Sequence, residues 1–218
     1  MSETEIVTTY HLDKPWDPHP MERKHFYDEQ IKEFKKNGKP SKAVGIFDVF
    51  IFTERKELIL QKRSAKKRHN PFLIDKTVGG HIQYGDSPYY TAMVETVQEL
   101  KAPSVVLREE EHFENTYKTL RENLESTAIM KMINKDIYFL DKVINDEKIT
   151  IANKVHLFFG IYSGGIKPVD REASGILYYE LDTLKEEMKR MPELFSHDLH
   201  FFLGKFEKEI DNFLKVLD

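Results

Sequence analysis

The stretch that decides the fold and site of this chain covers residues 79–102 and reads GGHIQYGDSPYYTAMVETVQELKA. It opens with Gly79 and Gly80, and glycine lets a backbone turn sharply or approach a ligand closely. Ser87 is a suitable helix cap and Pro88 suits the first helical position. The stretch therefore predicts a glycine-rich loop that leads directly into a helix.

The predicted helix carries oxygen ligands on one face. Glu95 and Glu99 are four residues apart and share that face, and Gln98 lies beside them. Such oxygens suit Mg²⁺ or Mn²⁺, and Mg²⁺ commonly binds through one or two carboxylates together with substrate phosphates. The positive end of the helix dipole also favours an anion at the loop. We therefore predict a divalent-cation site at Glu95, Gln98 and Glu99, next to a phosphate-bearing ligand.

Strand and helix patterns are mixed along the chain without regular alternation. Two β-rich runs with a short charged turn between them precede the glycine-rich stretch and predict a hairpin. Apolar spacing typical of amphipathic helices recurs before and after it. A mixed sheet with helices packed on its faces fits this order, so the expected fold class is α/β. Strands are expected at 43–53, 57–62, 75–82, within 128–144, and at 154–162 and 176–180, and helices at 21–37, 88–101, 107–124, 184–191 and 197–217.

Composition narrows the function classes. The chain has 218 residues, which fit one large domain or a domain with additions, and its 40% hydrophobic and 32% charged content predicts a folded globule. A net charge of −4 does not suggest a nucleic-acid partner. The absence of cysteine excludes disulfides, thiolate metal sites and cysteine nucleophiles. No apolar run reaches membrane length and the first residues lack a secretion signal, so we expect a cytoplasmic protein with no membrane partner.

The glycine-rich loop and its helix resemble the signature of the Nudix hydrolases, G-x5-E-x7-R-E-U-x-E-E-x-G-U, where U is a bulky aliphatic residue. Gly80 takes the first glycine position, Asp86 the first acidic position, and Glu95 and Glu99 two of the helix glutamates. The resemblance covers residues 41–102 well and 154–203 loosely. It implies a Nudix-like α/β/α sandwich with a mixed sheet over 41–218. Residues 1–40 would form an arm and helix packed on this core, and residues 103–127 an inserted helical segment.

The resemblance implies Mg²⁺-dependent hydrolysis of a small nucleoside-diphosphate-linked compound, with Glu99 as principal metal ligand and Glu95 as second ligand or orienting group. The signature is degenerate, because Val94 replaces its arginine and Gln98 one of its glutamates. A second reading therefore stays open, in which the chain is a catalytically impaired nucleotide-binding or regulatory module. A third reading is an isopentenyl-diphosphate isomerase, whose chemistry, as the resemblance implies, relies on a cysteine that this chain lacks.

Residues outside the helix complete the predicted site. Arg63 begins a basic loop that suits a negatively charged diphosphate. Gly79, Gly80 and His81 are further candidates for substrate contact, although a lone histidine is more often a hydrogen-bonded structural residue. Glu172 lies in a late acidic turn where some members of the family place an additional acid, so it is a candidate general base. The N-terminal arm and the 107–124 helix are candidate surfaces for a homodimer.

Overall fold

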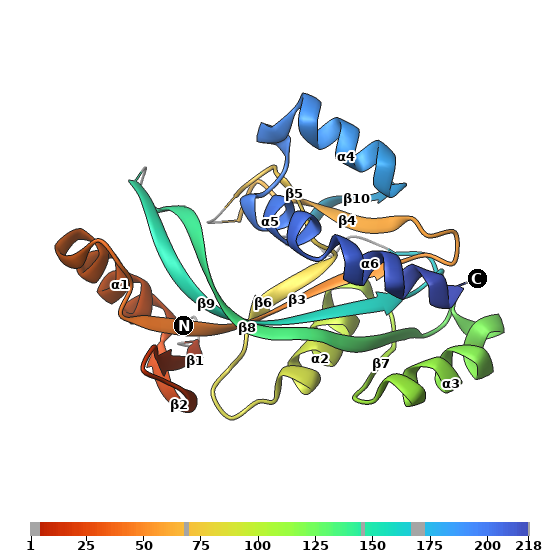
Figure 1. Cartoon of the computed structure of the whole chain (residues 1–218), viewed down its shortest axis with the longest axis horizontal. Helices are drawn as coiled ribbons and strands as arrows, with labels where there is room; N and C mark the ends of the chain where they lie inside the picture. The colour runs from red at the N-terminus through yellow and green to blue at the C-terminus, as the bar shows by residue number, and fades with distance from the viewer. Residues whose placement is uncertain (1–4, 68–69, 145–146, 167–172, 218) are drawn as a thin grey trace.

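The computed structural model describes residues 5–67, 70–144, 147–166 and 173–217, and strand β3 (Lys42–Phe52) forms the centre of its mixed sheet (Figure 1). Ten of the eleven β3 residues are buried, as expected for an apolar strand covered on both faces. Along one side, β3 runs parallel to β9 (Glu147–Ile161). Along the other side it pairs in succession with β1 (Ile6–His11), β6 (Val78–His81) and β4 (Leu58–Arg63).

The remaining strands extend this sheet on both sides. The main sheet runs in the order β10–β4–β3–β9–β8–β7, with antiparallel and parallel neighbours in one layer. The hairpin predicted from residues 43–53 and 57–62 is present as β3 and β4. The other strands are β2 (Lys14–Glu22), β5 (Ile74–Asp75), β7 (Ser104–Leu107), β8 (Ala128–Ile144) and β10 (Ala173–Tyr179).

Helices cover both faces of the sheet, which confirms the predicted α/β sandwich (Figure 1). Helix α2 (Pro88–Leu100) packs on one face, where Ala92 and Leu100 join a core with Phe47 and Val49. On the other face lie α5 (His197–Lys205) and α6 (Glu207–Leu214). The other helices are α1 (Arg23–Asn37), α3 (Glu110–Leu120) and α4 (Leu181–Arg190), with short 3-10 turns at Arg121–Asn123, Pro192–Leu194 and Lys215–Leu217.

The ends of α2 follow the local sequence. The Ser87 hydroxyl accepts a hydrogen bond from the Tyr90 N–H, and Pro88 begins the helix. At the other end Lys101 adopts a left-handed conformation with φ 56°, and Pro103 follows. Because caps and prolines act within a few residues, these boundaries were predictable from sequence.

The segment 197–217 differs from the single helix that its apolar spacing predicts. The helix breaks at Phe206, where φ is −109° and ψ is 24°, and divides into α5 and α6. Phe202 lies before the break with its ring 6.5 Å from Phe50, and Phe213 lies after it, 5.8 Å from Phe52. Because sheets twist, a bent pair of helices can follow β3 further than one straight helix.

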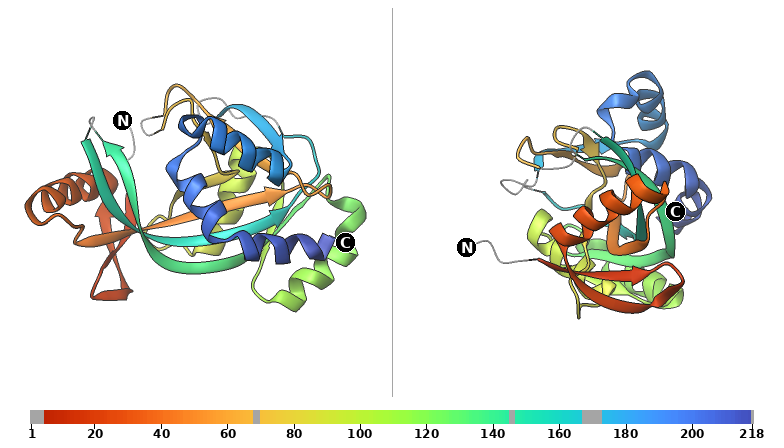
Figure 2. Two further views of the ribbon diagram at one scale, coloured as in Figure 1. Left: turned by 45° about the horizontal axis from the view of Figure 1, so that its top comes forward. Right: turned by 90° about the vertical axis from the view of Figure 1, so that its left-hand side faces the viewer.

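The N-terminal arm joins the sheet and also covers it. Strand β1 pairs with β2 and, through Thr9–His11, with the start of β3. Figure 2 shows this hairpin and α1 together at one end of the molecule. Phe26 and Tyr27 of α1 are buried in the same core as the C-terminal helices. Within the described ranges, no helix is long and apolar enough to cross a membrane.

Candidate functional site

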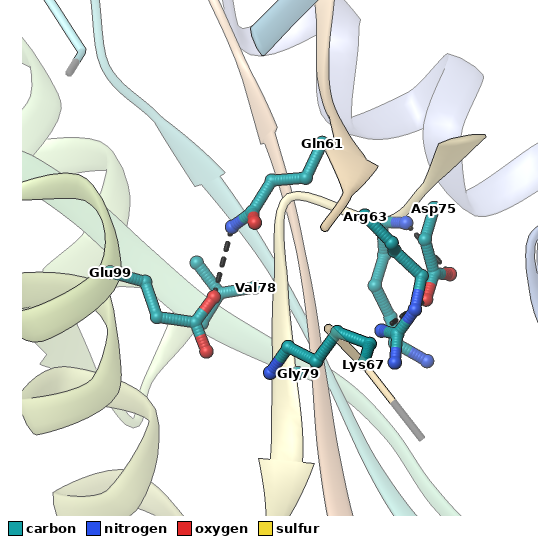
Figure 3. A pocket seen from close by; sticks show the side chains of 8 residues that line it. Gln61, Arg63, Lys67, Asp75, Val78, Gly79 and Glu99 are labelled. Carbon is teal, nitrogen blue, oxygen red and sulfur yellow. Dashed lines mark hydrogen bonds and ion pairs between the residues drawn. The ribbon is translucent and has the colours of Figure 1, made fainter. Parts of the chain in front are cut away.

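A pocket opens where β4 and β6 diverge from each other along β3 (Figure 3). Strand β6 pairs with Ile46–Val49 and β4 only with Ile51–Phe52, so the two strands diverge from the same side of one partner. Thr77 holds the junction: its hydroxyl donates to the Ile59 carbonyl and accepts from the Ile51 N–H. The pocket is open to solvent and is lined by Gln61, Arg63, Lys67, Asp75, Lys76, Val78, Gly79 and Glu99.

Glu99 brings a carboxylate from α2 into this pocket. The Gln61 amide donates a hydrogen bond to Glu99 Oε2 at 2.9 Å (Figure 3). It donates a second hydrogen bond to the Thr77 carbonyl. Burial raises the pKa of Glu99 to about 7, although the Gln61 hydrogen bond and the Lys67 charge both lower it. The removal of water therefore dominates, and this carboxyl ionises more readily once additional positive charge arrives.

Glu95 lies one turn earlier on α2 and is partly buried. Burial raises its pKa, and the nearby Glu5 carboxylate raises it further. Burial lowers the pKa of Lys67 and the Glu99 and Glu95 charges both raise it, but of the two carboxylates only that of Glu99 lines the pocket. Gln98, the third predicted metal ligand, is exposed and does not line the pocket.

Three cationic side chains line the pocket, from Arg63, Lys67 and Lys76. Arg63 Nη1 lies 3.0 Å from Asp75 Oδ2, and Lys76 Nζ lies 2.8 Å from Asp48 Oδ1. Lys67 extends toward Gly79 (Figure 3). Burial lowers the pKa of Lys67, while the Glu99 charge raises it. The pocket therefore offers both a carboxylate for a cation and ammonium and guanidinium groups for an anion.

The paired glycines serve close packing. A Cβ on Gly79 would lie 2.5 Å from Lys76 Cε and 2.8 Å from Asp48 Oδ1, and one on Gly80 would lie 3.2 Å from the Phe47 ring. Gly85 has a different reason, since its φ of 96° is left-handed. The strand thus passes directly over the Asp48–Lys76 ion pair, and a side chain at 79 would displace it.

His81 is engaged with the N-terminal part of the chain. Its Nε2 lies 2.9 Å from the Tyr27 hydroxyl and its Nδ1 lies 3.8 Å from Glu5 Oε1. Its side chain is only 11% exposed. His81 is therefore hydrogen-bonded within the protein, and its contact with a substrate stays a prediction. Glu172, the candidate base, lies outside the described residues.

Asp48, Lys76 and Gln61 were not singled out from the sequence, and Lys67 was considered only as part of the basic loop after Arg63. Asp48 interrupts an otherwise apolar strand, and that charge among buried positions was the available signal. Its side chain is 1% exposed, and Lys76 also lies 3.5 Å from Asp198 of α5. Lys76 and Asp198 are 122 residues apart in the chain, so no local pattern links them.

Among the described residues, no group of three or more His, Cys, Asp or Glu is arranged to hold a metal ion. Glu99 nevertheless supplies a carboxylate to a pocket with cationic walls, and Glu95 lies one helical turn before it on α2. Such a set suits a cation that shares its coordination with waters and ligand phosphates rather than one held in a preformed protein cage.

The sequence and the fold of this chain are similar to those of known proteins. Residues 42–197 match the model of the NUDIX domain. The fold is similar to that of DR0079 from Deinococcus radiodurans, with 13% identity, a TM-score of 0.52 and coverage of 74% of this chain and 81% of that one. It also resembles a bifunctional NMN adenylyltransferase/ADP ribose pyrophosphatase from Francisella tularensis, at 11% identity, TM-score 0.50 and coverage of 86% and 46%.

Curated relatives match over a shorter segment. Isopentenyl-diphosphate Delta-isomerases from Streptomyces coelicolor and Streptomyces griseus are each 34% identical to this chain over 70 residues. The match spans 32% of this chain and 36% of each relative.

Proposed function

The chain belongs to the NUDIX domain family, and from this premise we propose that it is a divalent-cation-dependent hydrolase of a nucleoside-diphosphate-linked compound. The carrying observation is the meeting of Glu99 and Lys67 in the pocket between β4 and β6. A carboxylate and an ammonium group there match the two needs of a metal–diphosphate complex, oxygen ligands for the cation and positive charge for the phosphates. Weakened activity is part of the proposal, because Gln98 is exposed.

The residues present fit Mg²⁺ or Mn²⁺. Glu99 would hold the cation and Glu95 would be a second ligand or orient it. When bound, such a cation neutralises phosphate charge and makes water a better nucleophile. The raised pKa of Glu99 agrees with this role, since a buried carboxyl that is partly protonated near pH 7 gains from a positive partner. Gln98 contributes at most through solvent.

Other residues of the chain would bind the diphosphate, orient Glu99 and activate the attacking water. Lys67 binds and orients the diphosphate, and Gln61 fixes the Glu99 carboxylate through its 2.9 Å hydrogen bond. Arg63 completes the cationic wall while it stays paired with Asp75. Gly79 would border the ligand, since it lines the pocket, while its missing side chain leaves room for the Asp48–Lys76 pair. Glu172 remains our proposed base for the attacking water.

Two alternatives are favoured by particular observations. The exposure of Gln98, with Val94 at the arginine position, favours an impaired binding or regulatory module. The matching segment of the Streptomyces isomerases favours an isoprenoid diphosphate as ligand. This chain has no cysteine, so isomerase chemistry of the expected type lacks its nucleophile. All three readings share a diphosphate in the pocket.

We also propose a cytoplasmic homodimer. The helix at 107–124 is less suited to the interface than its spacing suggested, because Phe113 and Tyr117 of α3 are buried in this chain's own core. The arm offers an exposed Trp16 on β2, which supports it as the contact surface. Light scattering of the whole chain and of Trp16→Ser tests the dimer.

The proposed function is tested in two stages. Titration of Mg²⁺ or Mn²⁺ with inorganic pyrophosphate should raise the melting temperature, because a ligand that binds only the folded state stabilises it. Nucleotide sugars, dinucleotides, nucleoside triphosphates and isopentenyl diphosphate are then screened for turnover.

Glu99→Gln should remove turnover and most of the metal effect, with Glu186→Gln on the surface of α4 as the matched control. Turnover that survives Glu99→Gln rejects the proposed metal position. Metal and pyrophosphate binding without turnover favours the regulatory module.

A further inference from the structure

The N-terminal arm reaches strand β6 through a circuit of four side chains. Arg23 Nη1 donates to Glu5 Oε2 at 2.7 Å, and the Arg23 N–H donates to the Glu5 carbonyl at 2.9 Å. Glu5 Oε1 lies 3.8 Å from His81 Nδ1, whose Nε2 meets the Tyr27 hydroxyl at 2.9 Å. Because Arg23 and Tyr27 are one turn apart on α1, the circuit clamps both arm and helix to β6.

This circuit lies at the side of the pocket. His81 comes two residues after Gly79, which lines the pocket, on the same short strand. The Arg23 charge helps to lower the pKa of Lys67, and the Glu5 charge raises that of Glu95. Through its contact with His81, the Arg23–Glu5 pair lies next to the end of β6 that follows the pocket-lining Gly79.

The pair is built to exchange partners more easily than the pairs inside the pocket. The Arg23 and Glu5 side chains are 39% and 35% exposed, whereas Asp75 and Asp48, the partners of Arg63 and Lys76, are 6% and 1% exposed. An ion pair that water already reaches contributes little to stability, so opening it costs little. A guanidinium also binds phosphate oxygens in bidentate fashion.

We propose that Arg23 is a recognition residue of this site. When the ligand binds, the Arg23 guanidinium separates from the Glu5 carboxylate and binds a phosphate oxygen of the ligand. The N-terminal arm then forms one wall of the pocket. The inference rests on the proposed function, because the ligand is the diphosphate compound inferred above. Arg23 and Glu5 lie before residues 42–197, the part matched by the family model. Recognition through the arm is therefore a property of this chain in addition to its NUDIX domain.

The test compares the two halves of the pair. Calorimetry measures the binding of inorganic pyrophosphate, in the presence of Mg²⁺, to the whole chain and to Arg23→Gln, Glu5→Gln and Lys24→Gln. Arg23→Gln should weaken binding about tenfold. This is the loss expected for one charge-assisted hydrogen bond, reduced because Arg23 in the unmodified chain must first separate from Glu5. Glu5→Gln should bind as tightly as the unmodified chain or more tightly, because it releases Arg23. Lys24, exposed on the same helix, controls for net charge.

Opposite behaviour of the two variants separates recognition from anchoring. If the pair only anchors the arm, each substitution breaks the same contact, and both variants should lose affinity and melting temperature equally. That outcome, or unchanged binding by Arg23→Gln, overturns the inference. If the unmodified chain does not bind pyrophosphate with Mg²⁺, the proposed function fails too. If it binds and only Glu99→Gln weakens binding, the recognition role alone is rejected.

Discussion

Two groups of charged side chains meet at strand β6, and they differ in how their charges are compensated. Beneath the strand, Lys76 lies between Asp48 at 2.8 Å and Asp198 at 3.5 Å, with all three side chains at most 13% exposed. In front of it, Lys67 and Glu99 face an open hollow. There Glu99 has a neutral amide as a hydrogen-bond partner. We call these the inner cluster and the pocket cluster.

The difference separates a structural role from a ligand-binding one. In the inner cluster the acidic partners raise the pKa of Lys76, so it stays charged despite its burial, while burial raises the pKa of Asp48 to about 6. In the pocket cluster burial wins at both groups, lowering the pKa of Lys67 and raising that of Glu99 to about 7. A ligand that brings positive charge would therefore stabilise the ionised form of Glu99 in the open pocket.

Removal of the inner lysine should have the largest effect. Lys76→Met leaves Asp48 buried without its cation, and breaking a buried pair in this way costs about 3–5 kcal/mol of unfolding free energy. Lys67→Met is the matched control, with an expected cost below about 1 kcal/mol because Lys67 borders the open pocket. Urea denaturation measures both. Equal losses of unfolding free energy in the two variants would show that the inner cluster is no more important for stability than the pocket cluster.

A methyl group at position 79 should disturb the inner cluster from the side of the strand. Gly79→Ala places a carbon 2.8 Å from Asp48 Oδ1 and 2.5 Å from Lys76 Cε, so the ion pair must shift. Overpacking of this kind costs about 1–3 kcal/mol. Gly80→Ala, whose new carbon meets only the Phe47 ring at 3.2 Å, should cost less. The reverse order in thermal denaturation would contradict the described packing.

The pH dependence of stability should report the pocket cluster. The pKa of Glu99 is raised in the folded state from its usual 4.5 to about 7, so folding favours the protonated form. Its contribution is present below about pH 4.5 and is lost as pH rises through 7. Without divalent cations, Glu99→Gln should therefore gain about 1–2 kcal/mol over the unmodified chain between pH 5 and pH 8.

Asp48 shifts in the same direction, with a pKa raised to about 6, but it is common to both proteins and cancels in this difference. Mg²⁺ with pyrophosphate should reduce the gain, because the ligand complex supplies the positive charge that ionised Glu99 lacks. A parallel pH profile for the two proteins would mean that Glu99 is not enclosed as described.

The smallest effect is expected at Gln98. The signature places a glutamate there, and restoring it would strengthen the metal site if residue 98 faced the cation. Since Gln98 is exposed and outside the pocket lining, Gln98→Glu should improve Mn²⁺ affinity by no more than about threefold, the scale of a solvent-screened charge. A gain of tenfold or more in Mn²⁺ titration would bring Gln98 into the coordination sphere.

The parts of the fold that sequence predicted are those specified locally. The β3–β4 hairpin, the capped α2 and the amphipathic α3 each depend on residues close together in the chain. The break at Phe206 was missed because apolar spacing continues through it, and only the surface beneath decides where the helix bends. The arm was predicted, but its pairing with β3 is a tertiary contact that no local pattern specifies.

The same distinction applies to the site. Glu95 and Glu99 were found because helix geometry places them together. Asp48, Lys76 and Asp198 come from three distant parts of the chain, and their association becomes visible only once β3, β6 and α5 are packed. The roles of Arg63 and Glu172 in catalysis and binding stay predictions.

The placement of β1 has a consequence for the behaviour of the protein in solution. Thr9–His11 occupy the backbone groups of Lys42–Val44, where β3 would otherwise present a free sheet edge. Exposed edges of apolar strands recruit strands from other molecules. A chain shortened to begin after β2 would therefore leave its most hydrophobic strand open to intermolecular pairing. Beyond any catalytic role, the first residues would then act as a guard against self-association into β-rich aggregates.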